Sequence, residues 1–389
     1  MAGVAGFAVV NNPDLRAVRL KAGVARAQLF DARLLPDPQI SASADYPISQ
    51  VPDNLTAYSL GLDFNFGYFV TRRAAIDAAA AKVGQIDLDI IWQEWQVAQQ
   101  ARILFIRSIY LERKLALLKH MRNLYARRYV VSSEALRKGN LTLDVTGTDL
   151  TAKIDSATLV NDMEQQLSQA GHELNAILGV WPDAKPRLFA PGPPQGLEEQ
   201  EMNQLLIGMP QRRPDLMALR AGYESQEAKV HKAVLGQFPA LTVGVNQSSD
   251  NTNVHYVGNT ATLTLPFFNR NRGKIAVQAA TREQIHQEYQ ARLDKAYQDV
   301  ALLWAKQGLS MVQLRQLQAY IPTLATMVRK ARRAYANHNM DPVVYLNMEN
   351  TLANKRLKAI GTIQLLWETE IALDTLLARP VTPDTRDGR

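Results

Sequence analysis

Residues 12–19 read NPDLRAVR, and 201 positions later residues 213–220 read RPDLMALR. The same offset places PQISA (38–42) on PALTV (239–243). Farther along, an offset of 199 aligns RRAAI with NRGKI and LNAIL with LDTLL, at residues 72–76, 271–275, 174–178 and 373–377. Similarity at an almost constant spacing over most of a chain is typical of an internal duplication.

The duplication predicts how the chain is divided. We expect a first structural repeat at residues 1–180 and a second at residues 213–378. Residues 181–212 are rich in proline, a composition typical of a linker between repeats. Residues 379–389 are expected to form a flexible tail.

Each repeat is predicted to open with a helix and to continue with a β-hairpin. Asn12 suits a helix cap, Pro13 the first helical position, and Asp14 the positive end of the helix dipole. After Pro38 and Pro239 the apolar residues recur at every second position, which is typical of strands with one apolar face. The residues expected on that face include Leu60, Leu62, Phe64, Leu263 and Leu265.

The alternation by itself allows two explanations. One is a soluble sheet packed on a core, and the other is a membrane barrel with lipid outside and water inside. In the second case Leu60, Leu62, Phe64, Leu263 and Leu265 would face lipid.

A very long helix favours the membrane barrel. Residues 71–138 contain no proline and a single glycine, Gly84. A helix over this range would be roughly 100 Å long at about 1.5 Å per residue, and no compact soluble domain needs such a rod. Apolar residues continue along it at spacings of three and four, which predicts a seam facing other helices. Breaks at 138–140 and 337–339 predict that helices at 150–178 and 344–377 return antiparallel.

The number of strands predicts an oligomer. Four strands per chain cannot close a barrel, and open sheet edges are not tolerated in lipid. Three chains would supply 12 strands, which lies within the range of known barrels. We therefore expect a mainly α protein, built from a duplicated unit of helix, β-hairpin and long helical hairpin. Its trimer would form an α-barrel and a 12-stranded transmembrane β-barrel.

Several motifs resemble the TolC-type outer-membrane efflux factor family. They are the duplicated NPDL/RPDL helix, the strand-to-helix junction LPFFNRNRG (265–273), and the endings LNAILG and LDTLLA. The similarity extends over residues 12–378, and LPFFNRNRGKI most resembles the heavy-metal efflux (CzcC/CusC-like) branch. The resemblance implies a homotrimer in outer-membrane lipid, joined to a periplasmic adaptor protein and through it to an inner-membrane RND-type pump.

The resemblance also directs attention to a gate at the periplasmic mouth. Many family members carry paired Asp near the start of each returning helix, but here the matching positions hold Val145, Thr148, Val344 and Asn347. Nearby carboxylates could substitute for them. The candidate gate residues are therefore Asp144, Asp149, Asp341 and Asn347.

No residue pattern indicates an enzyme or a cofactor. The chain lacks Cys, its six His show no metal-ligand spacing, and no nucleotide-binding or hydrolase motif occurs in a suitable context. The net charge of +7 is dispersed along the chain, which argues against nucleic-acid binding. At the strand-to-helix junction, Asn269, Asn271 and Gly273 could form an anion-binding nest, but Asn271 as a helix cap with Gly273 easing the turn is the simpler interpretation.

The predicted function is passive export of metal cations or small toxic compounds through an outer-membrane duct that extends into the periplasm of a Gram-negative bacterium. A type I secretion duct or multidrug duct of the same fold remains an alternative, and a soluble helical scaffold is a third. The first residues, MAGVAGFAVV, show no secretory signal, so an exported protein would be represented here in mature or trimmed form.

Overall fold

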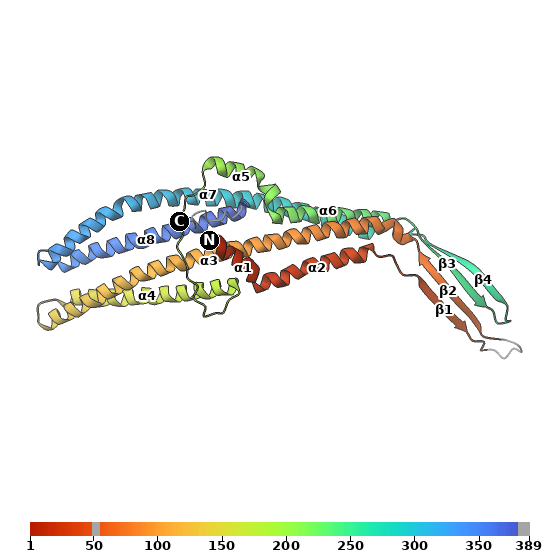
Figure 1. The fold of residues 1–389 in the computed structure, drawn as a ribbon, viewed down its shortest axis with the longest axis horizontal. Helices are drawn as coiled ribbons and strands as arrows, with labels where there is room; N and C mark the ends of the chain where they lie inside the picture. The colour runs from red at the N-terminus through yellow and green to blue at the C-terminus, as the bar shows by residue number, and fades with distance from the viewer. Residues whose placement is uncertain (49–54, 380–389) are drawn as a thin grey trace. The chain divides into compact units, whose positions relative to one another are not determined.

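The structure is a computed structural model and describes residues 1–48 and 55–379. Within the predicted tail, only Arg379 lies among the described residues. The described chain forms helices and strands in the order α1 (Ala2–Asn11), α2 (Pro13–Arg33), β1 (Gln39–Asp45), β2 (Ala57–Asn65), α3 (Gly67–Arg137), α4 (Leu143–Leu178), α5 (Glu199–Arg212), α6 (Pro214–Leu235), β3 (Ala240–Ser249), β4 (His255–Thr264), α7 (Arg272–Ala336) and α8 (Pro342–Leu376) (Figure 1).

The element order repeats once along the chain. Two helices, two strands and two long helices are followed by the same six elements again. The predicted cap at Asn12 is confirmed, because its Oδ1 accepts a hydrogen bond from the Leu15 amide at 3.0 Å. Its counterpart Arg213 has another contact, since its guanidinium lies 5.2 Å from the ring centroid of Trp92.

The strands form one antiparallel four-stranded sheet in the order β1-β2-β3-β4. The two predicted hairpins are therefore joined through β2 and β3, which pair from Tyr58 opposite Ser249 to Asn65 opposite Thr242. The register places the apolar residues on one face in rows such as Ile40, Leu62 and Val245. Polar and small residues occupy the other face. Within the described sheet, β1 and β4 are the edge strands, so each leaves one side without a paired neighbour.

The chain divides into two compact units, and each unit takes segments from both repeats. Unit 2 comprises 17–91 and 214–294, which hold the sheet, α6 and the adjoining parts of α2, α3 and α7. Its helices are joined by hydrogen bonds from side chains of α6 to backbone carbonyls of the neighbouring helices. Ser225 Oγ donates to the Ala78 carbonyl at 2.7 Å, and Gln226 Nε2 donates to the Gln278 carbonyl at 3.0 Å.

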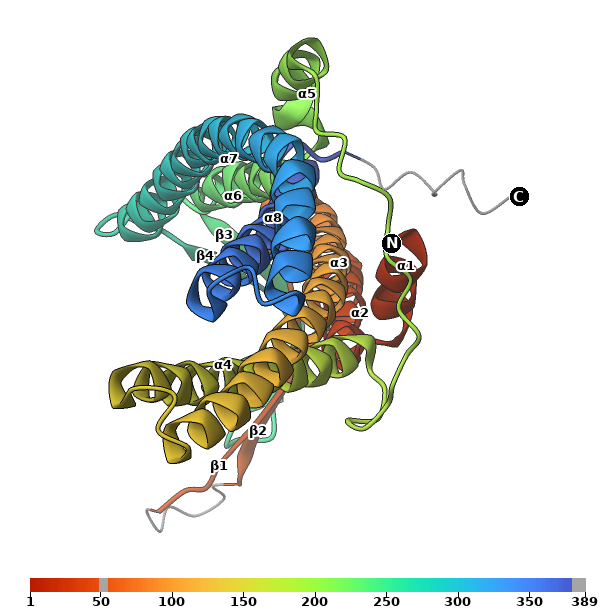
Figure 2. The same cartoon turned by 90° about the vertical axis from the view of Figure 1, so that its left-hand side faces the viewer.

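Unit 1 contains the larger part of the two helical hairpins, α3 with α4 and α7 with α8 (Figures 1 and 2). Residues of α3 pack against both neighbours, because Leu118 and Met121 share a core with Val160 of α4 and Ala353 of α8. Ile106 and Tyr110 form a second core with Ile371. Burial on several sides explains why the apolar residues of α3 recur at helical spacing over so many turns.

The predicted hairpin breaks are confirmed, but the returning helices start earlier than expected. Helix α4 begins at Leu143 rather than at residue 150, and α8 begins at Pro342 rather than at residue 344. Gly147 does not interrupt α4, since a single glycine lowers helix stability by only about 1 kcal/mol. None of the helices among residues 1–48 and 55–379 is both long enough and apolar enough to cross a membrane.

Candidate functional site

The tips of the two helical hairpins share one backbone geometry. After α3, the Gly139 amide donates to the Leu136 carbonyl and the Asn140 amide to the Ala135 carbonyl, both at 2.9 Å. After α7, the His338 amide donates to the Tyr335 carbonyl at 3.0 Å and the Asn339 amide to the Ala334 carbonyl at 2.8 Å. Both patterns are Schellman motifs, which place a left-handed residue just beyond the helix.

The two tips differ in the residue that takes this left-handed conformation. Gly139 has a φ of 74°, and His338 has a φ of 61°. Glycine adopts positive φ without steric cost, whereas a residue with a Cβ does so at a cost of about 1–2 kcal/mol. The second tip therefore holds strain that the first tip avoids.

Replacing His338 with Gly should stabilise the second tip by about 0.5–1 kcal/mol, because the gain in φ freedom is partly offset by the greater entropy of Gly in the unfolded chain. Amide hydrogen exchange in the last turn of α7 should slow about two- to fivefold. The reciprocal change, Gly139→Ala, should accelerate exchange at the end of α3. Equal exchange rates in His338→Gly and the parent protein would contradict the assignment of strain.

Asp144 lies exposed in the first turn of α4. Hydrogen bonds from the Thr142 hydroxyl, and then from the Val145 amide, hold the pKa of its carboxyl below the ordinary value. The start of a helix also favours negative charge. Asp144 is therefore ionised at neutral pH and faces solvent in the single chain.

Asp149 is placed differently from Asp144. Its residue is only 3% exposed, and its Oδ1 lies 2.6 Å from Nε of Arg128 on α3. The charge of Asp149 is thus balanced within its own hairpin, so it adds little net charge to a ring of carboxylates.

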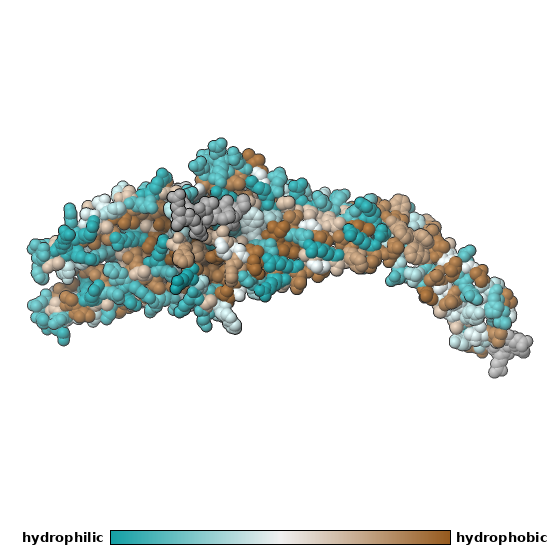
Figure 3. Space-filling model, viewed as in Figure 1, coloured by the Kyte–Doolittle hydropathy of each residue, from teal (hydrophilic) through white to brown (hydrophobic). Residues whose placement is uncertain are grey.

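Asp341 and Asn347 lie at the start of α8, on its exposed surface. The Asp341 carboxylate caps the helix by accepting from the Val343 amide at 2.6 Å and from the Val344 amide at 3.3 Å. Asn347 uses its backbone carbonyl to accept from the Thr351 hydroxyl at 2.7 Å. In Figure 3 the hairpin ends carry mainly hydrophilic residues.

The second hairpin has its own ion pair, which residue patterns alone did not identify. Arg332 of α7 lies 2.8 Å from Glu349 of α8, and it also donates to the Tyr345 hydroxyl at 3.1 Å. The Tyr345 hydroxyl in turn donates to Glu349 at 2.8 Å. In both hairpins an Arg before the turn pairs with a carboxylate after it. The similar spacing of Arg and carboxylate around the two turns is the sequence feature from which these ion pairs could have been predicted.

The predicted lipid-facing residues lie on the apolar face of the sheet. Leu60, Leu62 and Leu263 are exposed there in the single chain, and Phe64 is half-buried. Leu265 is exposed but lies one residue beyond the end of β4. An exposed apolar face of this kind requires a covering partner or lipid.

The strand-to-helix junction turns on residues other than the glycine. Arg270 and Asn271 have φ values of 46° and 54°, whereas Gly273 is the second residue of α7 and has no positive φ. Asn271 also ties the junction to α6, because its Nδ2 donates to the Ala233 carbonyl at 2.6 Å. The Asn269 carbonyl accepts from the Arg272 amide at 3.0 Å. Asn tolerates left-handed backbone better than most residues, so Gly273 is not needed for the turn.

A buried polar cluster in unit 1 was also missed by sequence reasoning. Arg102 of α3 lies 2.9 Å from Asp374 of α8, and both side chains are nearly excluded from water. Arg379 approaches the other carboxylate oxygen at 3.5 Å. Burial is the main cause that raises the pKa of Asp374 and also that of the neighbouring Glu370, while Arg102 and Arg379 oppose it. Among the described residues, no group of three or more His, Cys, Asp or Glu is arranged to hold a metal ion.

Several known proteins are similar to this chain in sequence and in fold. Residues 209–379 match the family described as outer membrane efflux protein. The probable outer membrane lipoprotein SilC of Salmonella typhimurium is 23% identical over 379 residues, covering 89% of this chain and 78% of SilC. The cation efflux system protein CusC of Escherichia coli K12 is 23% identical over 402 residues, covering 95% of this chain and 84% of CusC.

The fold agrees with these sequence similarities. A crystal structure of CusC superimposes with a TM-score of 0.76 at 20% identity, covering 96% of this chain and 91% of that one. The predicted resemblance to outer-membrane efflux factors and to their heavy-metal branch is confirmed.

Proposed function

We infer, from the outer membrane efflux protein domain that residues 209–379 form, that this chain is an outer-membrane efflux channel of the CusC and SilC type. The observation that carries the inference is the similarity to CusC, a cation efflux system protein, over 95% of the chain. Metal cations are the proposed cargo. A periplasmic adaptor and an inner-membrane pump supply the energy, and the channel itself catalyses no reaction.

A trimer is the proposed assembly, and the sheet supports it. Its four strands leave β1 and β4 as edges, and an apolar face with Leu60 and Leu62 is exposed. Pairing β4 of one copy with β1 of the next removes the edges, and three copies close a barrel of 12 strands. The apolar face then meets lipid, and the polar face lines a wet lumen.

A second surface favours the same assembly. An apolar stripe on α7 is exposed in the single chain, and its members are Leu302 (67%), Leu309 (74%), Tyr320 (73%) and Met327 (52%). These positions share one side of the helix at about 100° per residue. Copies of this chain are the proposed partners for the stripe, because trimerisation through the sheet brings neighbouring hairpins together.

Replacing Leu309 with Glu should therefore weaken the trimer. A carboxylate without a counter-charge in an apolar contact costs several kcal/mol, so we expect association to weaken at least about thirtyfold, or about 2 kcal/mol. Mass photometry in detergent should change from three times 43.4 kDa toward single chains. Gln318→Glu is the matched control, because it lies about 180° around α7 from Leu309. Equal masses for both variants would exclude the stripe from the interface.

The gate is proposed at the hairpin tips. Asp144 and Asp341 supply free negative charge, and Asn347 lies six residues after the Asp341 cap, nearly two turns into α8. Asp149 supports the wall through Arg128 rather than contributing net charge. Three copies of Asp144 and Asp341 would favour cations at the periplasmic mouth.

The negative charge of the proposed gate can be removed while the helix starts that carry it are preserved. Asn caps a helix about as well as Asp, so Asp341→Asn keeps the start of α8 where Ala would not. The double variant Asp144→Asn, Asp341→Asn should lose cation preference in planar-bilayer recordings. The loss should be larger at 0.01 M salt, where the Debye length is about 30 Å, than at 1 M, where it is about 3 Å. Asp162→Asn, on the same helix but several turns away, is the control. Unchanged cation preference in the double variant would locate the gate elsewhere.

Gene deletion tests the function as a whole. A strain without this gene should become sensitive to silver, copper, zinc or cobalt salts, and the intact gene should restore resistance. Sensitivity to dyes and antibiotics with unchanged metal tolerance would favour the multidrug duct. Loss of a secreted protein without either sensitivity would favour a type I secretion duct, and a particle that stays monodisperse without detergent would favour a soluble scaffold.

A further inference from the structure

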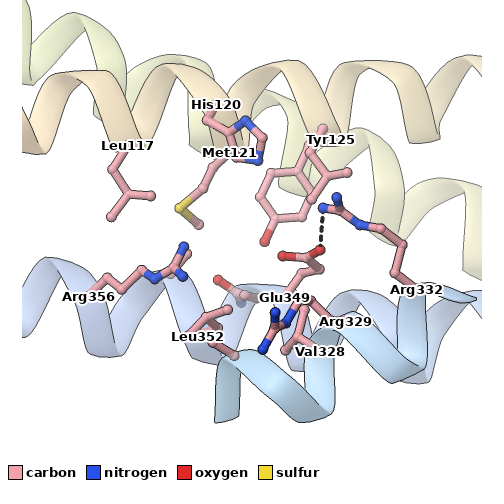
Figure 4. A pocket seen from close by; sticks show the side chains of 14 residues that line it. Leu117, His120, Met121, Tyr125, Val328, Arg329, Arg332, Glu349, Leu352 and Arg356 are labelled. Atoms are coloured by element: carbon pink, nitrogen blue, oxygen red, sulfur yellow. Dashed lines mark hydrogen bonds and ion pairs between the residues drawn. The ribbon is translucent and has the colours of Figure 1, made fainter. Parts of the chain in front are cut away.

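A cavity of about 350 Å³ opens between α3 and the α7–α8 hairpin in unit 1 (Figure 4). Helix α3 contributes His120, Met121 and Tyr125 to its lining. Helices α7 and α8 contribute Arg329, Arg332, Glu349 and Arg356, whose side chains surround the opening in Figure 4. Its volume falls within the range of small-molecule sites.

The charged groups around the cavity are unbalanced. Three guanidiniums face one carboxylate, and Arg332 already pairs with Glu349 at 2.8 Å. Among residues 1–48 and 55–379, Arg329 donates only to the Thr326 hydroxyl, at 3.0 Å. Arg356 has neither an ion pair nor a hydrogen bond with any residue in the described ranges. Both side chains are exposed, so their charges are solvated by water and are available to an incoming anion.

The floor of the cavity is apolar. Met121, Val328, Leu352 and Ala353 line it and are themselves buried. Such a floor gives no advantage to a bare inorganic anion, and the guanidiniums repel metal cations. A ligand that fits both parts has an apolar body and one carboxylate at its end, since Arg binds carboxylates in a bidentate way.

The cavity lies away from the surface proposed for trimerisation. Arg329 is about 200° around α7 from Met327, which belongs to the apolar stripe. The opening therefore stays accessible when the stripe is covered by another copy.

We propose that this cavity is a binding site for small aromatic or branched organic carboxylates. The Arg329 and Arg356 guanidiniums bind the carboxylate, and Met121, Val328 and Leu352 contact the apolar body. A bound ligand contacts both α3 and the α7–α8 hairpin, so it stabilises their packing.

Naphthalene-2-carboxylate is a suitable probe, because its amide has almost the same shape and no charge. Isothermal titration calorimetry would use the full chain in lipid nanodiscs, with empty nanodiscs subtracted. We expect the carboxylate to bind at least about tenfold more tightly than naphthalene-2-carboxamide, since a hydrogen bond to a charged group contributes about 1.5–3 kcal/mol.

Variants assign that binding to the cavity. The double variant Arg329→Gln, Arg356→Gln should lose this tenfold preference for the carboxylate. Arg333→Gln removes an exposed charge from the same helix outside the cavity, so it should bind the probe as the parent does. Ala325→Phe should block the opening without changing the charge. It should therefore lower the affinity for both the carboxylate and the carboxamide.

Three results would overturn the proposal. The first is no binding of the carboxylate at millimolar concentration. The second is equal affinity for the carboxylate and the amide, which would mean apolar adsorption alone. The third is an equal loss of affinity for the carboxylate in Arg333→Gln and in the double variant, which would mean diffuse attraction to a basic surface.

Discussion

Replacing Arg102 with Met is expected to lower the free energy of unfolding by about 3–5 kcal/mol at neutral pH, the usual cost of leaving one partner of a buried ion pair behind. Arg102 and Asp374 meet at 2.9 Å with side chains only 6% and 10% exposed. Without the guanidinium, the Asp374 carboxylate stays buried, and the cation that remains near it among the described residues is Arg379, at 3.5 Å. Arg102 also holds Gln99 by a hydrogen bond at 2.7 Å, which is lost as well.

The loss of stability caused by Arg102→Met should depend on pH. Burial raises the pKa of Asp374 above its ordinary value of 3.8, and Arg102 opposes that increase. Removing Arg102 raises this pKa further, so the folded variant holds its proton to higher pH than the unfolded chain does. Stability of the variant then falls as pH rises above 3.8, and the difference from the parent shrinks under acid conditions, where Asp374 is protonated in both states.

Urea unfolding followed by circular dichroism at several pH values would measure this effect. Arg107→Met is the matched control, because Arg107 lies on the same helix and its pair with Glu368, at 3.5 Å, is 41% and 24% exposed. Such a pair contributes about 0–1 kcal/mol. The double variant Arg102→Met, Asp374→Leu should regain most of the lost stability. A cost of Arg102→Met no larger than that of Arg107→Met would show that the buried pair is not what stabilises this region.

Replacing Leu62 with Arg should destabilise the assembled channel by about 2–4 kcal/mol if the apolar face of the sheet meets lipid near the bilayer midplane. Leu62 lies between Ile40 and Val245 in the central rows of that face and is exposed in the single chain. A charge at this depth must be removed from water without a partner.

Ser59→Arg is the internal comparison, because Ser59 lies on the polar face between Ser43 and Ser248. A lumen filled with water should accept this Arg at little cost. Folding into lipid vesicles, measured by heat-modified mobility or tryptophan fluorescence in urea, gives the free energy of each variant. Equal costs for the two variants would contradict the assignment of lipid and lumen faces.

Much of the fold could be predicted from local sequence. The duplicated motif at Asn12 and Arg213, the alternation in β2, and the helical spacing of apolar residues in α3 each depend on neighbours within a few residues. Backbone geometry fixes those periods at 2.0 and 3.6 residues, so they appear directly in the sequence. The hairpin breaks were predictable for the same reason, although the first turns of α4 and α8 extended farther than expected.

The surroundings of the candidate gate residues were predictable only in part. Asp341 directly precedes α8, and a carboxylate at that position is predicted to cap the helix. The sequence therefore predicts both the cap and the negative charge of Asp341. The sequence could not separate Asp144 from Asp149, which lie five positions apart on α4, because their difference depends on which side of the helix meets Arg128.

The sequence by itself determined the repeat, the strands, the long helices and their turns, because these depend on backbone preferences and on the periodic placement of apolar side chains. Only the tertiary structure decided that β2 pairs with β3, that Arg102 meets Asp374 across 272 positions, and that Arg329 and Arg356 share a cavity with Met121. Those contacts depend on the angle and register at which separate elements pack. Many residue combinations satisfy the same periodicity, so side-chain partners between distant helices are fixed by packing geometry rather than by local pattern.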